Sequence, residues 1–125
     1  MTRNSRSIGG NKRRIRGIVD ELVANALNAG ASTVDVQVKS QSDYFEIRVD
    51  DNGKGMNLEQ AREVEQLLQQ PRRGELEEYY GDLVGVSGFG SGLTIVGMLV
   101  DEAEVKSVLG RGTTIWVRRW HNLKD

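Results

Sequence analysis

Apolar and polar residues alternate with a period of two along parts of the chain, which is the pattern of half-buried β-strands. The clearest example contains Phe45, Ile47 and Val49, separated by Glu46 and Arg48. The strands predicted in this way are 33–39, 44–50, 102–108 and 113–120. The first two are joined by a tight polar turn, so we expect them to pair antiparallel, and the last two to form a closing hairpin.

Other parts of the chain place apolar residues at the three- and four-residue intervals of an amphipathic helix. The first predicted helix covers about 11–27, and Gly30 is a natural C-terminal cap for it. Its apolar stripe is Ile15, Ile18, Val19, Leu22 and Ala26. A second helix starts near Asn57 or Asn52, and a third, apolar helix covers 94–100. The apolar positions of the second helix are Leu58, Ala61, Val64 and Leu68.

The length of 125 residues suits one compact domain with a real core. The net charge of -1 gives no overall attraction to nucleic acid or membranes. The basic start of the chain fits either a solvated tail or an arm that binds nucleic acid or a partner. We expect a flexible basic tail at 1–11, one domain at 12–120 and a C-terminal tail at 121–125.

The chain has no cysteine and a single histidine, His121. Disulfides and metal sites built from several cysteines or histidines are therefore excluded. No apolar run approaches the roughly 18 residues of a membrane span, and no signal peptide is visible. A cytoplasmic protein that does not enter membranes is expected.

Asp51 is the first candidate for chemistry, because it follows the strand 44–50 and extends its alternation onto the apolar side. A carboxylate that faces a core is costly by several kcal/mol unless a partner compensates its charge. Gly53 and Gly55 follow, where the backbone must turn or let a ligand approach. The alternative interpretation is an ordinary turn, with Asp51 capping the next helix.

Two further sets of polar residues border the predicted core. Glu21, Asn25 and Asn28 form a row on the first helix that either lines a cleft or is a solvated flank. Thr113 shares the core side of the last strand with Ile115, either to face the same pocket as Asp51 or because threonine favours strands.

The stretch 70–87 has no period, and a segment this long inside a small domain is usually functional. We expect a lid at about 70–88. The glycine-rich stretch 88–93 comes next and opens the third helix, where free N–H groups suit phosphate. Its spacing is neither that of a P-loop nor that of a dinucleotide-binding fingerprint.

Taken together, four stretches resemble the nucleotide-binding boxes of the GHKL superfamily. Its members are type II topoisomerase ATPase domains, the ninety-kilodalton heat-shock chaperones, sensor histidine kinases and the mismatch-repair protein MutL. The matching stretches are 21–26, 51–56, 88–93 and 112–114, in the order and spacing of the family. The resemblance covers about 12–118. It implies the Bergerat fold, an α+β two-layer sandwich whose mixed, mostly antiparallel sheet carries helices on one face.

The resemblance also implies a role for each residue. Asp51 accepts a hydrogen bond from the adenine amino group, helped by Thr113 through a shared water. Asn25 binds Mg²⁺ and Glu21 is the general base. The implied ATP-binding set is Asn25, Asn28, Asp51, Gly53, Gly55, Met56, Gly88, Phe89, Gly90, Ser91, Gly92, Leu93 and Thr113.

The resemblance leaves the reaction open between two interpretations. In the first, the chain is a Mg²⁺-dependent ATPase or protein kinase that uses Glu21. In the second, it is an anti-sigma-like module in which ATP and the lid control the binding of a protein. The first box and 29–31 are similar to MutL, whereas the C-terminal half is closer to the kinase and anti-sigma branch. The expected partners are ATP or ADP, a protein partner or second domain, and a second copy of the chain; nucleic acid and membranes are not expected.

Overall fold

The computed structural model describes residues 2–69 and 92–121, with side chains from Asn11 onward. Its elements in chain order are α1 (Thr2–Asn28), β1 (Val34–Ser40), β2 (Tyr44–Asp51), α2 (Leu58–Leu68), α4 (Gly92–Leu99), β3 (Glu102–Val108) and β4 (Gly112–Trp120). The four predicted strands are thus present within a residue or two of their expected bounds. No helix in the described part of the chain is long and apolar enough to cross a membrane.

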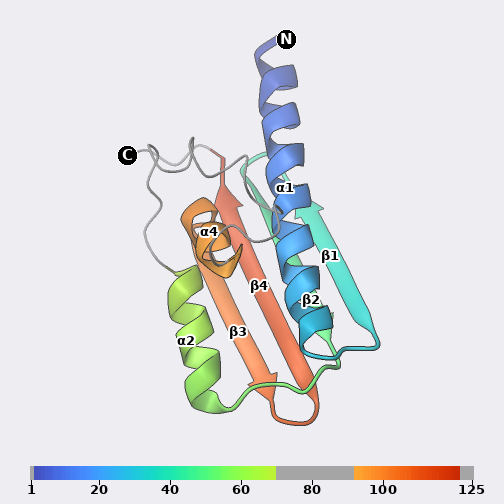
Figure 1. Cartoon of the computed structure of the whole chain (residues 1–125). Coiled ribbons are helices and arrows are strands. Elements are labelled where there is room, and N and C mark those ends of the chain that lie inside the picture. The colour runs from blue at the N-terminus through green and yellow to red at the C-terminus, as the bar shows by residue number, and fades with distance from the viewer. Residues whose placement is uncertain (1, 70–91, 122–125) are drawn as a thin grey trace.

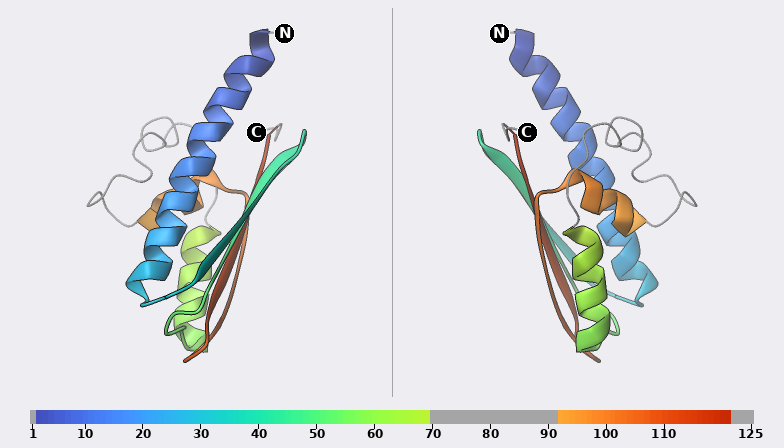
Figure 2. Two further views of the ribbon diagram at one scale, coloured as in Figure 1. Left: turned by 90° about the vertical axis from the view of Figure 1, so that its right-hand side faces the viewer. Right: turned by 90° about the vertical axis from the view of Figure 1, so that its left-hand side faces the viewer.

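The strands form one sheet in the order β1-β2-β4-β3 (Figure 1). All three pairs of neighbours in this described sheet are antiparallel. The helices α1, α2 and α4 cover the same face of the sheet, and no helix of the described residues lies on its other face (Figure 2). The two-layer α+β sandwich that the sequence predicts is confirmed.

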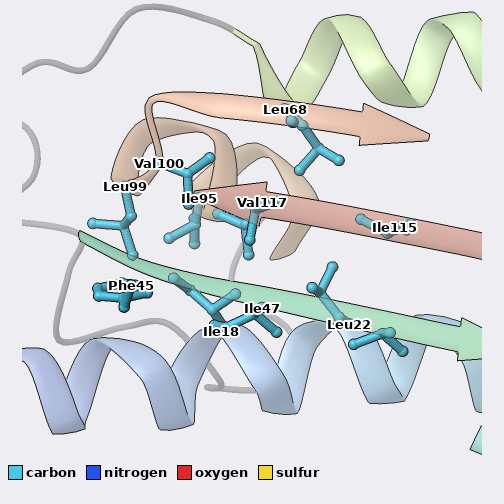
Figure 3. Close-up of a cluster of buried hydrophobic side chains, with 13 residues drawn as sticks. Ile18, Leu22, Phe45, Ile47, Leu68, Ile95, Leu99, Val100, Ile115 and Val117 are labelled. Atoms are coloured by element: carbon cyan, nitrogen blue, oxygen red, sulfur yellow. The ribbon is translucent and has the colours of Figure 1, made fainter. Parts of the chain in front are cut away.

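The core lies between the sheet and the three helices (Figure 3). Ile18 and Leu22 of α1 and Phe45 and Ile47 of β2 are almost fully buried. Burying one such side chain stabilises the fold by about 1.5–3 kcal/mol relative to its exposed state. The predicted stripe of α1 is confirmed, and it fixes that helix across the sheet next to the end of β2.

Two predictions about helices are wrong. α1 begins at Thr2, nine residues before the expected start, and its first turns extend beyond the sheet (Figure 2). Gly9 and Gly10 lower helix propensity by only about 1 kcal/mol each, and the residues around them continue the helix. On α2, Leu58 is 68% exposed instead of buried. The capping box of Asn57 and Gln60 fixes the helix start so that Leu58 faces outward.

His121 belongs to the fold, although we expected it in a tail. Its backbone N–H donates to the carbonyl oxygen of Asp43 at 2.8 Å. Its ring nitrogens lie 3.2 Å from Asn11 Nδ2 and 3.1 Å from the carbonyl oxygen of Gln41. These contacts tie the end of β4 to α1 and to the β1–β2 turn. Residues 122–125 lie outside the described part of the chain.

The face of the sheet that carries no helix is organised around Arg118. Its guanidinium carbon lies 4.2 Å from the ring centroid of Tyr44, and Trp116 and Trp120 are also within cation–π distance. Arg118 also donates two hydrogen bonds to Oε1 of Glu46, at 2.7 and 3.1 Å. These bonds, together with the attraction of the charges, hold the pKa of Glu46 below its ordinary value of 4.5.

We expect Glu46→Gln to lower the free energy of unfolding at neutral pH by about 1 kcal/mol, because it removes a charged and partly buried pair. A carboxyl group whose folded pKa is depressed stabilises the fold above its unfolded pKa, and that contribution is lost as the pH falls through the folded pKa. Urea unfolding should therefore separate the variant from the parent at neutral pH and not in strong acid. Glu104→Gln, at a side chain that is 60% exposed, is the control. An equal loss at both pH values would contradict this account.

Candidate nucleotide site

The carboxylate of Glu21 lies against the first residue of α4. A Cβ atom added to Gly92 would lie 1.7 Å from Oε1 of Glu21, so glycine at 92 is what leaves room for the carboxylate. The two residues are 71 positions apart in the sequence, and the packing of α1 against α4 brings them together. The structure therefore joins the first and third of the four boxes at one point.

The polar row of α1 divides between two environments. Glu21 and Asn25 are half-buried, and Asn28, the last residue of α1, is exposed. The row thus leaves the border of the core toward the C-terminal end of the helix. Of the three side chains, Glu21 and Asn25 are therefore the two that border the core.

Asp51 and Thr113, which alternation assigns to the core side of their strands, are direct partners in the ladder between β2 and β4. Thr113 is buried and Asp51 is half-buried. Oδ1 of Asp51 accepts the N–H of Gly53 at 2.7 Å, and none of the hydrogen bonds in the described part of the chain uses Oδ2. The helix cap expected in the alternative interpretation is Asn57, not Asp51. One acceptor atom of Asp51 is therefore committed to the turn and the other is available.

Ser107 is a residue of this site that the sequence analysis missed. Its hydroxyl lies 2.7 Å from Oγ1 of Thr113, accepts the N–H of Met56 at 2.7 Å, and lies 3.1 Å from the carbonyl oxygen of Gly112. It joins β3, β4 and the segment after the glycine turn. The signal was present, because Ser107 follows Ala103 and Val105 on the core side of its strand.

The glycine turn, residues 52–55 after Asp51, is hydrogen-bonded to segments on both sides of it. The N–H of Lys54 donates to the carbonyl oxygen of Ala29 at 2.9 Å, and its carbonyl oxygen accepts the N–H of Gly110 at 2.7 Å. Oδ1 of Asn52 accepts the N–H groups of Ser32 and Thr33, each at 2.9 Å. The turn is thereby held to the end of α1, to the start of β1 and to the β3–β4 turn.

Gly55 has φ of 72°, and a Cβ atom there would lie 2.1 Å from the carbonyl oxygen of Val108. Gly55→Ala should therefore lower the free energy of unfolding by more than about 2 kcal/mol, since it adds a backbone clash to the penalty of a left-handed residue. Gly30→Ala is the matched control: φ is 82° and no atom lies within 4 Å, so only the backbone penalty of about 1 kcal/mol remains. Equal losses for the two variants in urea unfolding would show that the close approach of Gly55 is not needed.

Several predicted site residues lie outside the described part of the chain. They are Gly88, Phe89, Gly90 and Ser91, together with the predicted lid at about 70–88. Gly92 and Leu93 are described and form the first two residues of α4. Leu93 is partly buried against the core.

Comparison with known proteins identifies the family. The sequence model of the histidine kinase-, DNA gyrase B- and HSP90-like ATPases matches residues 10–122. The DNA mismatch repair protein MutL of Chlorobium limicola is 43% identical over 58 residues, which are 46% of this chain and 9% of that protein. The matched segment thus spans less than a tenth of this relative's length. Since the family model covers nearly the whole chain and the fold agrees with it, the chain belongs to the family of histidine kinase-, DNA gyrase B- and HSP90-like ATPases and is an ATP-binding domain of the GHKL type.

Proposed function

We propose that this domain binds ATP together with Mg²⁺ and transfers the terminal phosphate to water or to a protein, with Glu21 as general base. The observation that carries the proposal is the contact of the Glu21 carboxylate with the start of α4 at Gly92. It places a proton acceptor beside the N-terminus of a helix, where N–H groups and the helix dipole favour phosphate. A base and an anion site side by side are what phosphoryl transfer requires.

The adenine base binds at the other end of the site, against Asp51. Its second carboxylate oxygen accepts a hydrogen bond from the adenine amino group, while the first holds the Gly53 N–H at 2.7 Å. Thr113, directly opposite in the ladder, assists through a water. Gly53, Gly55 and Met56 shape this side of the pocket, and the fastened turn keeps them in place before the ligand arrives.

The phosphates lie toward α1 and α4. Gly92 and Leu93 provide the first N–H groups of α4, and Gly88, Phe89, Gly90 and Ser91 are proposed to complete the phosphate-binding segment. Asn28, at the exposed end of α1, lies beside the nucleotide in this arrangement. ATP therefore spans from the end of β2 to the start of α4.

The residues present fit a Mg²⁺ ion that arrives with the nucleotide. Asn25 supplies an amide oxygen, a hard ligand of the kind that Mg²⁺ prefers, on the same half-buried row as Glu21. When bound, the ion neutralises charge on the phosphates. Glu21 takes a proton from the attacking water while the oxygen of that water bonds to the γ-phosphorus. The bond between the γ-phosphorus and the oxygen that bridges to the β-phosphate breaks, which gives ADP and inorganic phosphate.

The contribution of Asn25 can be measured separately from catalysis. We expect Asn25→Ala to weaken ATP binding in the presence of Mg²⁺ by about tenfold, the effect of losing one ligand worth roughly 1.4 kcal/mol. Binding measured with a chelator should be the same in variant and parent. Gln66→Ala, an exposed amide on α2, is the control. A loss of the same size with and without Mg²⁺ would assign Asn25 to the nucleotide and not to the ion.

A further inference from the structure

The outer edge of β1 is an unpaired edge of the sheet (Figure 1). The N–H of Gln41 donates to the carbonyl oxygen of Tyr44, and that of Asn52 to Thr33, at 2.8 and 3.3 Å. Since the residues of an antiparallel ladder alternate in direction, the odd-numbered residues of β1 face β2. Its even-numbered residues point their N–H and C=O groups outward. No hydrogen bond within residues 2–69 and 92–121 takes up these groups.

The opposite edge of the sheet is closed by side chains. Glu65 of α2 accepts the N–H of Val105 at 2.8 Å, and Gln69 donates to the carbonyl oxygen of Ala103 at 2.9 Å. Among the described residues β1 has no such cover, and of the usual devices that prevent strand addition it carries only two charged side chains, Asp35 and Lys39. Its seven residues contain no proline and pair with β2 one to one, without a bulge. The open edge is therefore continuous along the whole strand.

The sequence of β1 is complementary to itself. An antiparallel pair of β1 strands related by a two-fold axis at Gln37 overlaps over the whole of Val34–Ser40. In this register Asp35 lies opposite Lys39 of the partner subunit, twice by symmetry. Only registers that pair even-numbered residues with one another let the outward N–H and C=O groups meet. The nearest such registers are centred on Val36 or Val38. They shorten the overlap and place Asp35 opposite a glutamine, so one register is favoured.

Within residues 11–69 and 92–121 of one chain, no ion pair involves Asp35. It lies opposite Asp50 in the β1–β2 ladder, and like charges directly opposite are destabilising. The Lys39 side chain is 57% exposed, and its Nζ lies 3.8 Å from Oε2 of Glu46. Because it is exposed, it can also contact a carboxylate of a partner subunit. On the helix side of the sheet Val36 and Val38 are 39% and 47% exposed. The same register places Val36 opposite the partner's Val38 and would cover both.

We propose that the occupant of this edge is a second copy of the chain, paired β1 to β1 about Gln37 into one continuous sheet across both subunits. The inference stands on β1 alone and is independent of the proposed phosphoryl transfer.

Disulfide crosslinking tests the register, because the chain has no cysteine of its own. Gln37 lies on the axis in a pair without direct hydrogen bonds, where Cα atoms approach to about 4.5 Å, within the range of a disulfide. Gln37→Cys should therefore form a covalent dimer under mild oxidation. Asp35→Cys is the control: four residues separate the two copies of position 35, about 13 Å, and it should not crosslink.

Exchanging the charges of Asp35 and Lys39 tests the same pairing, with the molar mass in solution as the measured quantity. The parent chain should be a dimer of twice 13.9 kDa in light scattering. Asp35→Lys and Lys39→Asp each place like charges opposite one another and should raise the dissociation constant about tenfold, whereas the double exchange restores it. Circular dichroism checks that each variant is folded. A parent monomer at every concentration, equal crosslinking at 35 and 37, or a double exchange as weak as the singles would overturn the proposal.

Discussion

Glu21→Gln should lower the rate of phosphate release by about 10²- to 10⁴-fold, the usual contribution of a general base. Glutamine has nearly the shape of glutamate, so it fits the space that Gly92 leaves beside α4. It cannot accept the proton of the attacking water. ATP affinity should be unchanged, because the proposed role of Glu21 is in the transfer step and not in holding the nucleotide.

The matched control is Asp20→Asn, the neighbouring carboxylate of α1, which is exposed. It changes the net charge by the same amount and should leave the rate unaltered. Phosphate release is measured under single-turnover conditions, with ATP binding measured on the same samples. A Glu21→Gln variant as fast as the parent would remove Glu21 from the role of base. A parent that binds ATP and releases no phosphate would favour the binding-module interpretation.

Asp51→Asn should weaken ATP binding by about 10- to 100-fold, which corresponds to the loss of a hydrogen bond to a charged group worth roughly 1.5–3 kcal/mol. In the parent, one carboxylate oxygen serves the N–H of Gly53 and the other is available to the adenine amino group. Asparagine has only one acceptor oxygen. Its amide nitrogen must then face one of two N–H donors, so either the turn or the adenine contact is lost.

Asp43→Asn is the control for this variant, since Asp43 is an exposed carboxylate at the opposite end of the same hairpin. Isothermal titration with Mg²⁺ present gives the affinities, and urea unfolding separates a damaged turn from a lost contact. An Asp51→Asn variant that is as stable as the parent and binds ATP equally would contradict the proposed adenine site.

Much of this architecture could be predicted from periodicity. The alternation of Phe45, Ile47 and Val49 defined a buried strand face, and its extension placed Asp51 on the core side. The stripe of α1 defined which side of that helix is buried. These features are predictable because each depends on a local repeat of two or 3.6 residues.

The remaining features depend on contacts between distant segments, which no local repeat encodes. The fit of Glu21 against Gly92 requires α1 and α4 to meet. The role of Ser107 requires the register of β3 on β4 to be known, because only then does its hydroxyl reach Met56. In the same way, Asn52 could be seen as a turn residue, but not as the side chain that fastens Ser32 and Thr33.

The exposure of Val36 and Val38 shows a related limit. Their alternation indicates only that they share one face of the strand, which in the structure is the helix side of the sheet, opposite Val49 and Ile47. It could not show that β1 is the edge strand, where both valines remain 39% or more exposed. Strand order is a property of the whole sheet and is set by pairing across the chain.

The most direct test of the central claim is a titration of the unmodified chain with ATP and with GTP in the presence of Mg²⁺. Guanine carries a carbonyl oxygen where adenine carries its amino group, so the free oxygen of Asp51 would meet an acceptor and not a donor. The account predicts that ATP binds about 10- to 100-fold more tightly than GTP. No binding of ATP, or equal binding of the two nucleotides, would contradict the assignment of Asp51 and with it the proposed site.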